Sequence, residues 1–193
     1  MTVRYKSADG IGIITLDNPP INAIGQAVRA AFKKAIKDAL GDKVSRLIIT
    51  GNGKFFTGGA DATEFGQPAE PPHLNEVLLQ LVAFPAPTIA AINGTALGGG
   101  LEISLACRFR IASPNAVIGL PETNLGIVPG SGGTQRLSRL VGLAKAFDLI
   151  ANGKTFSASE ALAMGVVDLI ADDPLQAAKT LEQAVLEKTV TVD

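Results

Sequence analysis

The 193-residue sequence is 47% hydrophobic and 18% charged, contains 21 glycines and has a formal net charge of −1 at pH 7. Its length favours one domain with a substantial apolar core, and its balanced charge argues against nucleic-acid binding, which needs a basic surface for the phosphates. One cysteine, Cys107, and one histidine, His73, argue against a disulfide framework and against a zinc site.

The first half of the chain alternates between strand and helix patterns. Ile11 to Leu16 is apolar and β-branched, and it predicts a strand that ends before a pair of prolines. Apolar residues recur at helical spacing from Val28 to Leu40 and predict a helix, and residues 46–50 predict a second strand. The polar, proline-rich residues 67–72 predict a loop, and Leu74 to Val82 predicts a helix.

The second half continues this alternation. Residues 87–92 form an apolar run that predicts a buried strand, followed by a glycine-rich turn and a helix. Ser157 begins another helix with Glu160 three residues later, which is the pattern of a capping box. The other predicted elements are strands at 109–112, 116–118 and 166–170, and helices at 134–140, 143–151, 157–164 and from 174 onward.

Strand–turn–helix units therefore repeat along the chain without sequence identity between them. Such alternation is typical of an α/β fold in which many strands pair in parallel. In these folds the turns at the ends of the strands commonly carry the functional groups. The sequence thus predicts an α/β domain whose site is built from its turns.

Two glycine-rich turns have the same form. Residues 93–102 place three consecutive glycines before a predicted helix, with Glu102 in its first turn, and residues 55–61 run from apolar residues through glycines to Asp61. Glycines are costly to order and suit a place where the backbone approaches another group closely. The first N–H groups of a helix lack intrahelical partners and carry the positive end of its dipole. We therefore predict an oxyanion hole with a carboxylate beside it.

Other motifs that contain glycine or histidine do not fit. The glycines at 98–100 are not followed by a glycine at Ile103, so the dinucleotide-binding fingerprint is absent. Residues 51–54 lack the spacing of a Walker A loop, because Phe55 stands where Ser or Thr is required. The single histidine lies in the proline-rich loop, which argues against a Ser–His–Asp triad.

Five further side chains have ordinary structural interpretations when each is taken alone. Glu102 is compatible with a glutamate that merely favours the helix dipole, and Glu122 with a loop carboxylate in water. Cys107 is more typical of a small core residue than of a nucleophile. Arg108 and Arg110 are more typical of a solvated strand face than of a phosphate clamp.

Taken together, however, five stretches resemble the crotonase family, also called the enoyl-CoA hydratase/isomerase family. They are residues 18–23, 56–61, 93–102, 119–122 and 126–136, and they occur in the family's order over almost the whole chain. Residues 146–154 and 158–168 most resemble the amino-terminal hydratase part of a multifunctional fatty-acid β-oxidation enzyme. The resemblance implies a crotonase-like spiral of repeated strand–strand–helix units over residues 1–193.

The resemblance also implies roles in the hydration of 2-enoyl-CoA. The backbone N–H groups of Ala60 and Gly99 are expected to hold the thioester oxygen, on which negative charge develops. Glu102 is expected to activate the water that attacks C3, and Glu122 to deliver a proton to C2. With Glu122 alone moving a proton between C2 and C4, the same site would isomerise 3-enoyl to 2-enoyl thioesters.

The remaining expectations from the resemblance concern coenzyme A, which is part of the substrate. No other cofactor and no metal ion are expected. The predicted CoA-binding residues are Asn22, Ala23, Ile24, Lys54, Gly58, Asp61, Gly98, Leu120 and Gly130.

Full-length relatives continue with a helical segment that covers the active site and forms a trimer, or continue into a dehydrogenase part. We therefore expect this chain to lack that carboxy-terminal segment, with either a homotrimer or a covalently joined dehydrogenase domain in a longer protein. The alternative function is an acyl-CoA-binding fragment that needs the segment for turnover, because lids often complete such sites.

Hydropathy predicts no membrane span. The amino terminus shows no apolar signal region, and prolines interrupt the longest apolar stretch, residues 81–92. The expected location is the cytoplasm for a bacterial protein, and the mitochondrial matrix or the peroxisome for a eukaryotic one.

Overall fold

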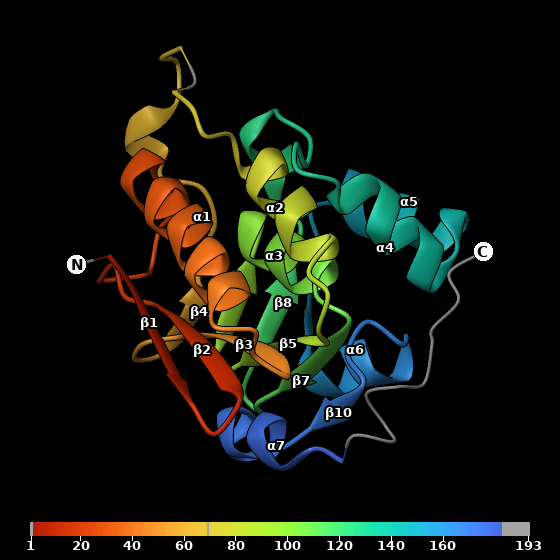
Figure 1. Cartoon of the computed structure of the whole chain (residues 1–193). Coiled ribbons are helices and arrows are strands. Elements are labelled where there is room, and N and C mark those ends of the chain that lie inside the picture. Colours follow the sequence, from red (N-terminus) through yellow and green to blue (C-terminus); the bar gives the residue numbers. More distant parts are fainter. Residues whose placement is uncertain (1, 69, 183–193) are drawn as a thin grey trace.

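Two β-sheets form the framework of the molecule, and the computed structural model describes residues 2–68 and 70–182 (Figure 1). The larger sheet has six strands in the spatial order β1 (Val3–Ala8), β2 (Ile11–Leu16), β3 (Arg46–Gly51), β5 (Thr88–Ile92), β7 (Phe109–Ala112) and β10 (Leu169–Ile170). The smaller sheet has four strands in the order β4 (Phe55–Thr57), β6 (Thr95–Leu97), β8 (Val117–Gly119) and β9 (Thr155–Ser157). Neighbouring strands pair in parallel, except in the antiparallel pairs β1–β2 and β8–β9.

Helices surround these sheets. In the described residues they are α1 (Gln26–Gly41), α2 (Leu74–Val82), α3 (Gly99–Ala106), α4 (Gly133–Val141), α5 (Leu143–Ala151), α6 (Ala158–Ala163), α7 (Pro174–Thr180) and the 3₁₀ helices η1 (Ala62–Glu64) and η2 (Glu122–Leu125). Helix α3 contacts strands of both sheets as well as α2 and α4. Because every residue of α3 is buried, its Glu102 carboxylate is held inside the molecule.

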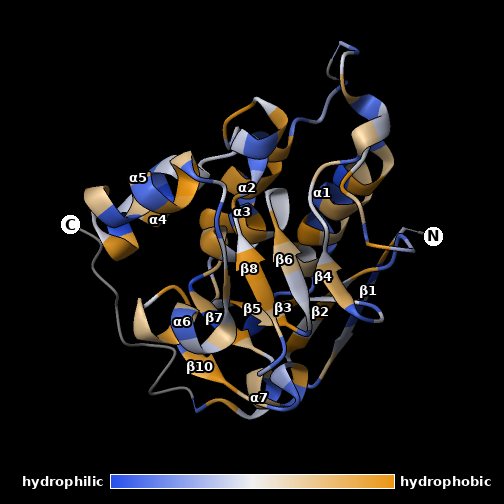
Figure 2. Ribbon diagram, turned by 180° about the vertical axis from the view of Figure 1, so that it is seen from behind, coloured by the Kyte–Doolittle hydropathy of each residue, from blue (hydrophilic) through white to orange (hydrophobic). Residues whose placement is uncertain are grey.

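The larger sheet is covered on both faces. All of β5 is buried, as is typical of a strand with parallel neighbours on both sides. Its alternate residues belong to different cores: Ala90 packs in the main core with α1, and Ile89 packs in a second core with α7. Figure 2 shows β8 and β10 coloured as hydrophobic. The central strand β5 of the larger sheet thus lies between two apolar cores.

Several sequence-based predictions are confirmed. The α/β class is correct, the strands at 11–16 and 109–112 and the helices at 74–82 and 143–151 have the predicted bounds, and the capping box at Ser157 and Glu160 is formed. Helix α1 begins two residues earlier than its apolar pattern, at Gln26. The part of the predicted final helix beyond residue 182 lies outside the described residues.

Four strands escaped prediction, and the last strand is much shorter than predicted. β1 is an edge strand with mostly exposed, mixed residues, and β4, β6 and β9 contain only three residues each. None of these shows a period long enough to identify. The strand predicted at 166–170 is β10 alone, since Val166 and Val167 are buried but precede the strand.

Nowhere in the described part of the chain is a helix both long enough and apolar enough to cross a membrane.

Candidate active site

The amino-terminal end of α3 is built from three glycines with different surroundings. Gly98 has φ +53° and ψ −122°, a conformation that residues with a side chain rarely adopt. Gly100 packs on β4, where a Cβ atom would lie 2.8 Å from the carbonyl oxygen of Thr57. Gly99 lies between them, in the first helical position, where the N–H has no intrahelical partner. The glycines thus bring the start of the helix against β4, and the Gly99 N–H is among the first helical N–H groups, which have no intrahelical bond.

A second backbone turn follows β4 and lies beside this helix end. Ile24 donates its N–H to the carbonyl of Gly59 at 2.8 Å and forms a parallel bridge with Ala60. Gly59 has φ +101°, and a Cβ on it would lie 2.8 Å from the carbonyl oxygen of Leu97, the last residue of β6. Since β4 and β6 are parallel neighbours, their carboxyl ends place Ala60 and Gly99 on one side of the sheet.

A cavity of about 440 Å³ joins the two turns and both glutamates. Its lining comes from segments far apart in the sequence, as expected for a site at the ends of parallel strands. The residues that line it are Ile24, Arg29, Ala60, Glu64, His73, Leu74, Asn75, Gly99, Glu102, Glu122, Ile127, Val128, Gly130 and Ser131. The structure therefore brings together the four residues predicted to carry the chemistry.

Glu102 is 3% exposed and is well supplied with hydrogen-bond donors. One carboxylate oxygen accepts the N–H of Ser131 at 2.6 Å and the N–H of Gly133 at 2.9 Å. Arg136 donates to the carbonyl of Ser131 at 2.7 Å and so holds this turn. Burial raises the pKa of Glu102, whereas the two N–H groups and the charge of Arg136 act in the opposite direction.

Glu122 has the opposite environment. It is half-buried at the start of η2, and its buried Oε2 has no hydrogen-bond partner among the described residues. Its Oε1 lies beside Gly98, 3.2 Å from the position that a Cβ there would take. Burial raises the pKa of Glu122 to about 7, and the negative charge of Glu102 adds to the increase. The two N–H donors favour the ionised form of Glu102, and the buried, unpartnered Oε2 favours the protonated form of Glu122, so a single proton shared by the pair lies on Glu122.

The predicted CoA contacts divide into two groups. Ile24 and Gly130 line the cavity. Asn22 is 2% exposed and its amide donates to the carbonyls of Asn52 and Phe55, so its side chain holds a turn, and its contact with CoA stays a prediction. The residues that do not line the cavity are Asn22, Ala23, Lys54, Gly58, Asp61, Gly98 and Leu120.

Two of this second group have clear local roles. Asp61 caps η1, since its carboxylate accepts the N–H of Thr63 at 3.0 Å and the Thr63 hydroxyl at 2.7 Å. Leu120 is 1% exposed and packs in the main core. Contact with CoA stays a prediction for these two residues, as it does for the exposed Lys54 and for Ala23, Gly58 and Gly98.

Several cavity residues were not identified from the sequence. His73 precedes α2, and Leu74 begins it. Arg29 lies on the buried face of α1, three residues before Phe32 and seven before Ile36. This spacing places a charged side chain on the apolar face of the helix, so it could have identified Arg29 as a buried charged residue from the sequence.

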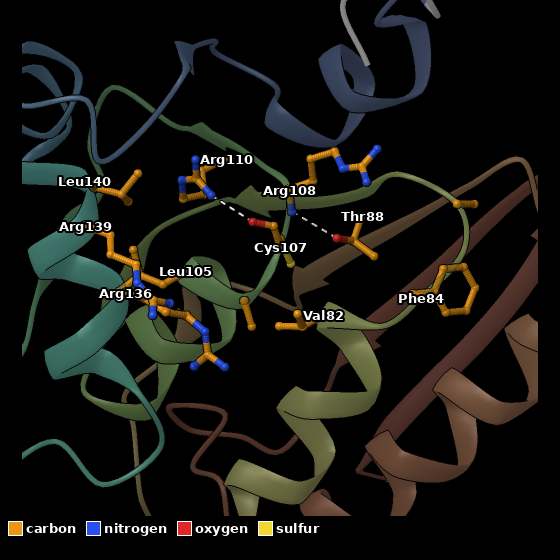
Figure 3. A pocket seen from close by; sticks show the side chains of 12 residues that line it. Val82, Phe84, Thr88, Leu105, Cys107, Arg108, Arg110, Arg136, Arg139 and Leu140 are labelled. Atoms are coloured by element: carbon orange, nitrogen blue, oxygen red, sulfur yellow. Dashed lines mark hydrogen bonds between the residues drawn. The ribbon is translucent and has the colours of Figure 1, made fainter. Parts of the chain in front are cut away.

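A second cavity, of about 250 Å³, surrounds Cys107 and four arginines (Figure 3). Burial raises the pKa of Cys107 to about 12, which agrees with its interpretation as a core residue. Arg108 is exposed, as predicted, but the prediction for Arg110 is wrong. Arg110 is 5% exposed, donates to the carbonyls of Cys107 and Val166, and forms an ion pair of 3.1 Å with Asp168. Val166 and Asp168 lie in the segment before β10.

Within residues 2–68 and 70–182, no group of three or more His, Cys, Asp and Glu side chains is arranged to hold a metal ion.

Comparison with known proteins gives a consistent result. The family described as enoyl-CoA hydratase/isomerase matches residues 6–189. The peroxisomal bifunctional enzyme of Danio rerio is 48% identical over 171 residues, which cover 88% of this chain and 24% of that protein. The probable enoyl-CoA hydratase of Bacillus subtilis is 42% identical over 190 residues, which cover 93% of this chain and 74% of that protein.

A solved structure of an enoyl-CoA hydratase from Bacillus anthracis has the same fold. It superimposes with a TM-score of 0.85 at 35% sequence identity, covering 97% of this chain and 76% of that one. The chain spans about a quarter of the length of the multifunctional relatives that it matches.

Proposed function

This chain belongs to the enoyl-CoA hydratase/isomerase family, and from that premise we propose that it hydrates 2-enoyl-CoA to 3-hydroxyacyl-CoA in fatty-acid β-oxidation. One observation carries the proposal: Glu102 and Glu122, with contrasting environments, line one cavity with the backbone turns at Ala60 and Gly99. Addition of water to a conjugated thioester requires a base, an acid and a site for negative charge, and this cavity offers all three.

The two glutamates divide the proton transfers. Ionised Glu102 accepts a proton from water as the water oxygen bonds to C3 of the enoyl group, and the double-bond electrons move toward the thioester oxygen. Protonated Glu122 then gives its proton to C2, so that Glu102 ends protonated and Glu122 ionised. The pair carries one proton throughout, and the reverse reaction exchanges the two roles.

The backbone N–H groups of Ala60 and Gly99 bind the thioester oxygen in this mechanism. Enolate character develops on that oxygen in the transition state, and donors fixed in a cavity away from water stabilise it strongly. Helix α3 adds the positive end of its dipole at Gly99. The reaction moves protons and no redox electrons, so the proposed chemistry uses no cofactor beyond the CoA of the substrate.

The same cavity supports a second reaction. Glu122 has an unpartnered carboxylate oxygen and a pKa of about 7, which suit it to remove a proton from C2 and return it to C4. We therefore include isomerisation of 3-enoyl-CoA to 2-enoyl-CoA as a side activity. The Glu102 carboxylate makes hydration the principal activity.

The setting of the reaction also belongs to the proposal. The name of the Danio rerio relative places that protein in the peroxisome and gives it two functions, and the Bacillus subtilis relative is bacterial. We infer that this domain works either joined to a dehydrogenase domain in a longer protein or as a homotrimer. Its location, cytoplasmic in a bacterium or organellar in a eukaryote, stays a prediction.

The test is an assay with crotonyl-CoA and a longer 2-enoyl-CoA, following loss of the conjugated thioester absorbance. We expect loss of absorbance that depends on enzyme concentration, and a gain of absorbance with a 3-enoyl-CoA substrate. Calorimetric titration with an acyl-CoA is run on the same preparation. Binding without hydration would replace the proposal by the alternative of an acyl-CoA-binding protein.

The contrast between the carboxylates predicts a pH profile. Burial raises the pKa of Glu122 to about 7, so Glu122 loses the proton that C2 needs as the pH rises through that value. We expect kcat/KM for hydration to fall about tenfold per pH unit above it, as for any single essential acid. The rate of dehydration should decrease above the same pH, because the pair of glutamates carries one proton in both directions of the reaction.

Initial rates measured on both sides of neutral pH test this profile. The residual rate of Glu122→Gln should lack the high-pH limb, since glutamine does not titrate. A parental rate that increases through neutral pH would contradict the assignment of Glu122 as the acid.

A further inference from the structure

An ion pair between a buried arginine and a partly exposed glutamate lies in the cavity wall and has no part in the proton transfers. Arg29 lies in α1, is 7% exposed and lines the cavity. Its guanidinium lies 2.7 Å from Oε2 of Glu64, which lines the same cavity. Burial of the Arg29 charge is costly unless the guanidinium has well-placed partners, so its hydrogen bonds show what holds it beside the reaction site.

Arg29 joins segments that are distant in the sequence. It donates to the backbone carbonyls of Ile24 at 3.3 Å, Glu70 at 3.0 Å and Pro72 at 2.8 Å. The other oxygen of Glu64 accepts a backbone N–H from the first turn of α1 at 2.5 Å. Figure 1 shows the gold segment with η1 beside the amino-terminal end of α1. One guanidinium thus fastens the turn before α1, η1 and the proline-rich loop together.

Two of these acceptors lie next to groups that face the reaction site. A Cβ atom on Gly99 would lie 3.1 Å from the Ile24 side chain and 3.1 Å from the Leu74 side chain, so both side chains lie against Gly99. Arg29 bonds to the carbonyl of Ile24 itself and to that of Pro72, two residues before Leu74. Ile24 also forms the bridge that places Ala60.

We propose that Arg29, paired with Glu64, is a positioning residue for hydration. It fixes the Ile24 and Leu74 side chains against the substrate carbonyl at Gly99, and through Ile24 it fixes the Ala60 N–H. This inference rests on the proposed function for its kinetic consequence. A lysine cannot replace the arginine, because the four acceptors are spread around a planar guanidinium and an ammonium group presents a single point.

The structure contains a matched control. Arg110 is 5% exposed, pairs with a carboxylate that is about as exposed as Glu64, and also donates to backbone carbonyls. It does not line the catalytic cavity. Arg110→Lys therefore disturbs a comparable buried network away from the reaction, and it measures the effect of lost stability alone.

The first experiment compares Arg29→Lys, Glu64→Gln and Arg110→Lys by thermal unfolding and by steady-state hydration of crotonyl-CoA. We expect Arg29→Lys to lower kcat about 10- to 100-fold with a smaller change in KM, because small misplacements of catalytic groups are costly. Glu64→Gln should have a weaker effect in the same direction. Arg110→Lys should keep kcat within about twofold per folded molecule, as a purely structural role requires. Equal kcat for Arg29→Lys and Arg110→Lys would overturn the inference.

The second experiment does not depend on turnover. Hydrogen exchange of peptides covering residues 58–61 and 70–77 reports whether these segments are held in place. Arg29→Lys should raise exchange there about tenfold or more, and Arg110→Lys should not. Unchanged exchange in Arg29→Lys would overturn the positioning role even if the parental protein were inactive. Parental inactivity with the expected exchange would refute the proposed function and leave the positioning role standing.

Discussion

Replacing Glu102 by glutamine should lower kcat for hydration about 100- to 10,000-fold, the range for loss of a general base. Glutamine keeps an oxygen that can accept the N–H groups of Ser131 and Gly133, so the turn between η2 and α4 should stay in place. It cannot accept a proton from water at neutral pH. The loss should therefore appear in kcat, while the Tm stays close to the parental value.

Glu122→Gln should cause a loss of similar size for a different reason. Its amide can still donate a hydrogen bond, but it cannot deliver a proton to C2. Because the two groups act on one water and one substrate, the double variant should be little slower than either single variant. Glu76→Gln, which changes an exposed residue in the first turn of α2, is the control. Parental rates in both single variants would refute the two-glutamate mechanism.

The residues expected to carry the chemistry could be predicted from the sequence because local constraints mark them. Three consecutive glycines have few uses, and here Gly98 adopts a positive φ while Gly100 lies against β4. A carboxylate in the first turn of the helix after them lies near the unpaired N–H groups by geometry alone. The sequence alone therefore predicts that Glu102 and Gly99 lie together.

The environment of each glutamate could not be predicted in the same way. The donors to Glu102 come from residues 29 and 31 positions later in the chain. The unpartnered oxygen of Glu122 follows from burial, which a short segment after a proline does not reveal. The sequence, together with the family resemblance, thus pointed to both glutamates, and only the folded chain divides them into a carboxylate with donors and one without.

Buried polar side chains were predicted least well, for the same physical reason. Arg29 bonds to carbonyls 41 and 43 residues away, Arg110 to one 56 residues away, and Asn22 to ones 30 and 33 residues away. A polar residue is expected at the surface unless a partner satisfies it. Sequence periodicity can show that a position faces the core, but it cannot show which distant carbonyls will be there.

The second large effect is expected for Gly99→Val. A Cβ at this position would lie 3.1 Å from the Ile24 and Leu74 side chains, closer than ordinary contact, and the valine methyl groups would extend further. Since all three residues line the cavity, the new side chain would occupy the space from which the thioester oxygen must reach the Gly99 N–H. Loss of one oxyanion donor costs about a hundred- to thousandfold in rate, so hydration should nearly disappear.

The competing explanation is that Gly99 only allows close packing at the start of α3. It predicts a lower Tm with normal turnover per folded molecule. The backbone of Gly99 does not have a positive φ, so valine introduces a steric conflict and no forbidden conformation. Gly41→Val is the matched control, because Gly41 also lacks a positive φ and has no atom within 4 Å of its Cβ position.

Thermal unfolding, CoA binding and hydration measured on one preparation separate the two explanations. A Gly99→Val protein that unfolds early but hydrates crotonyl-CoA at the parental rate would place the oxyanion site elsewhere.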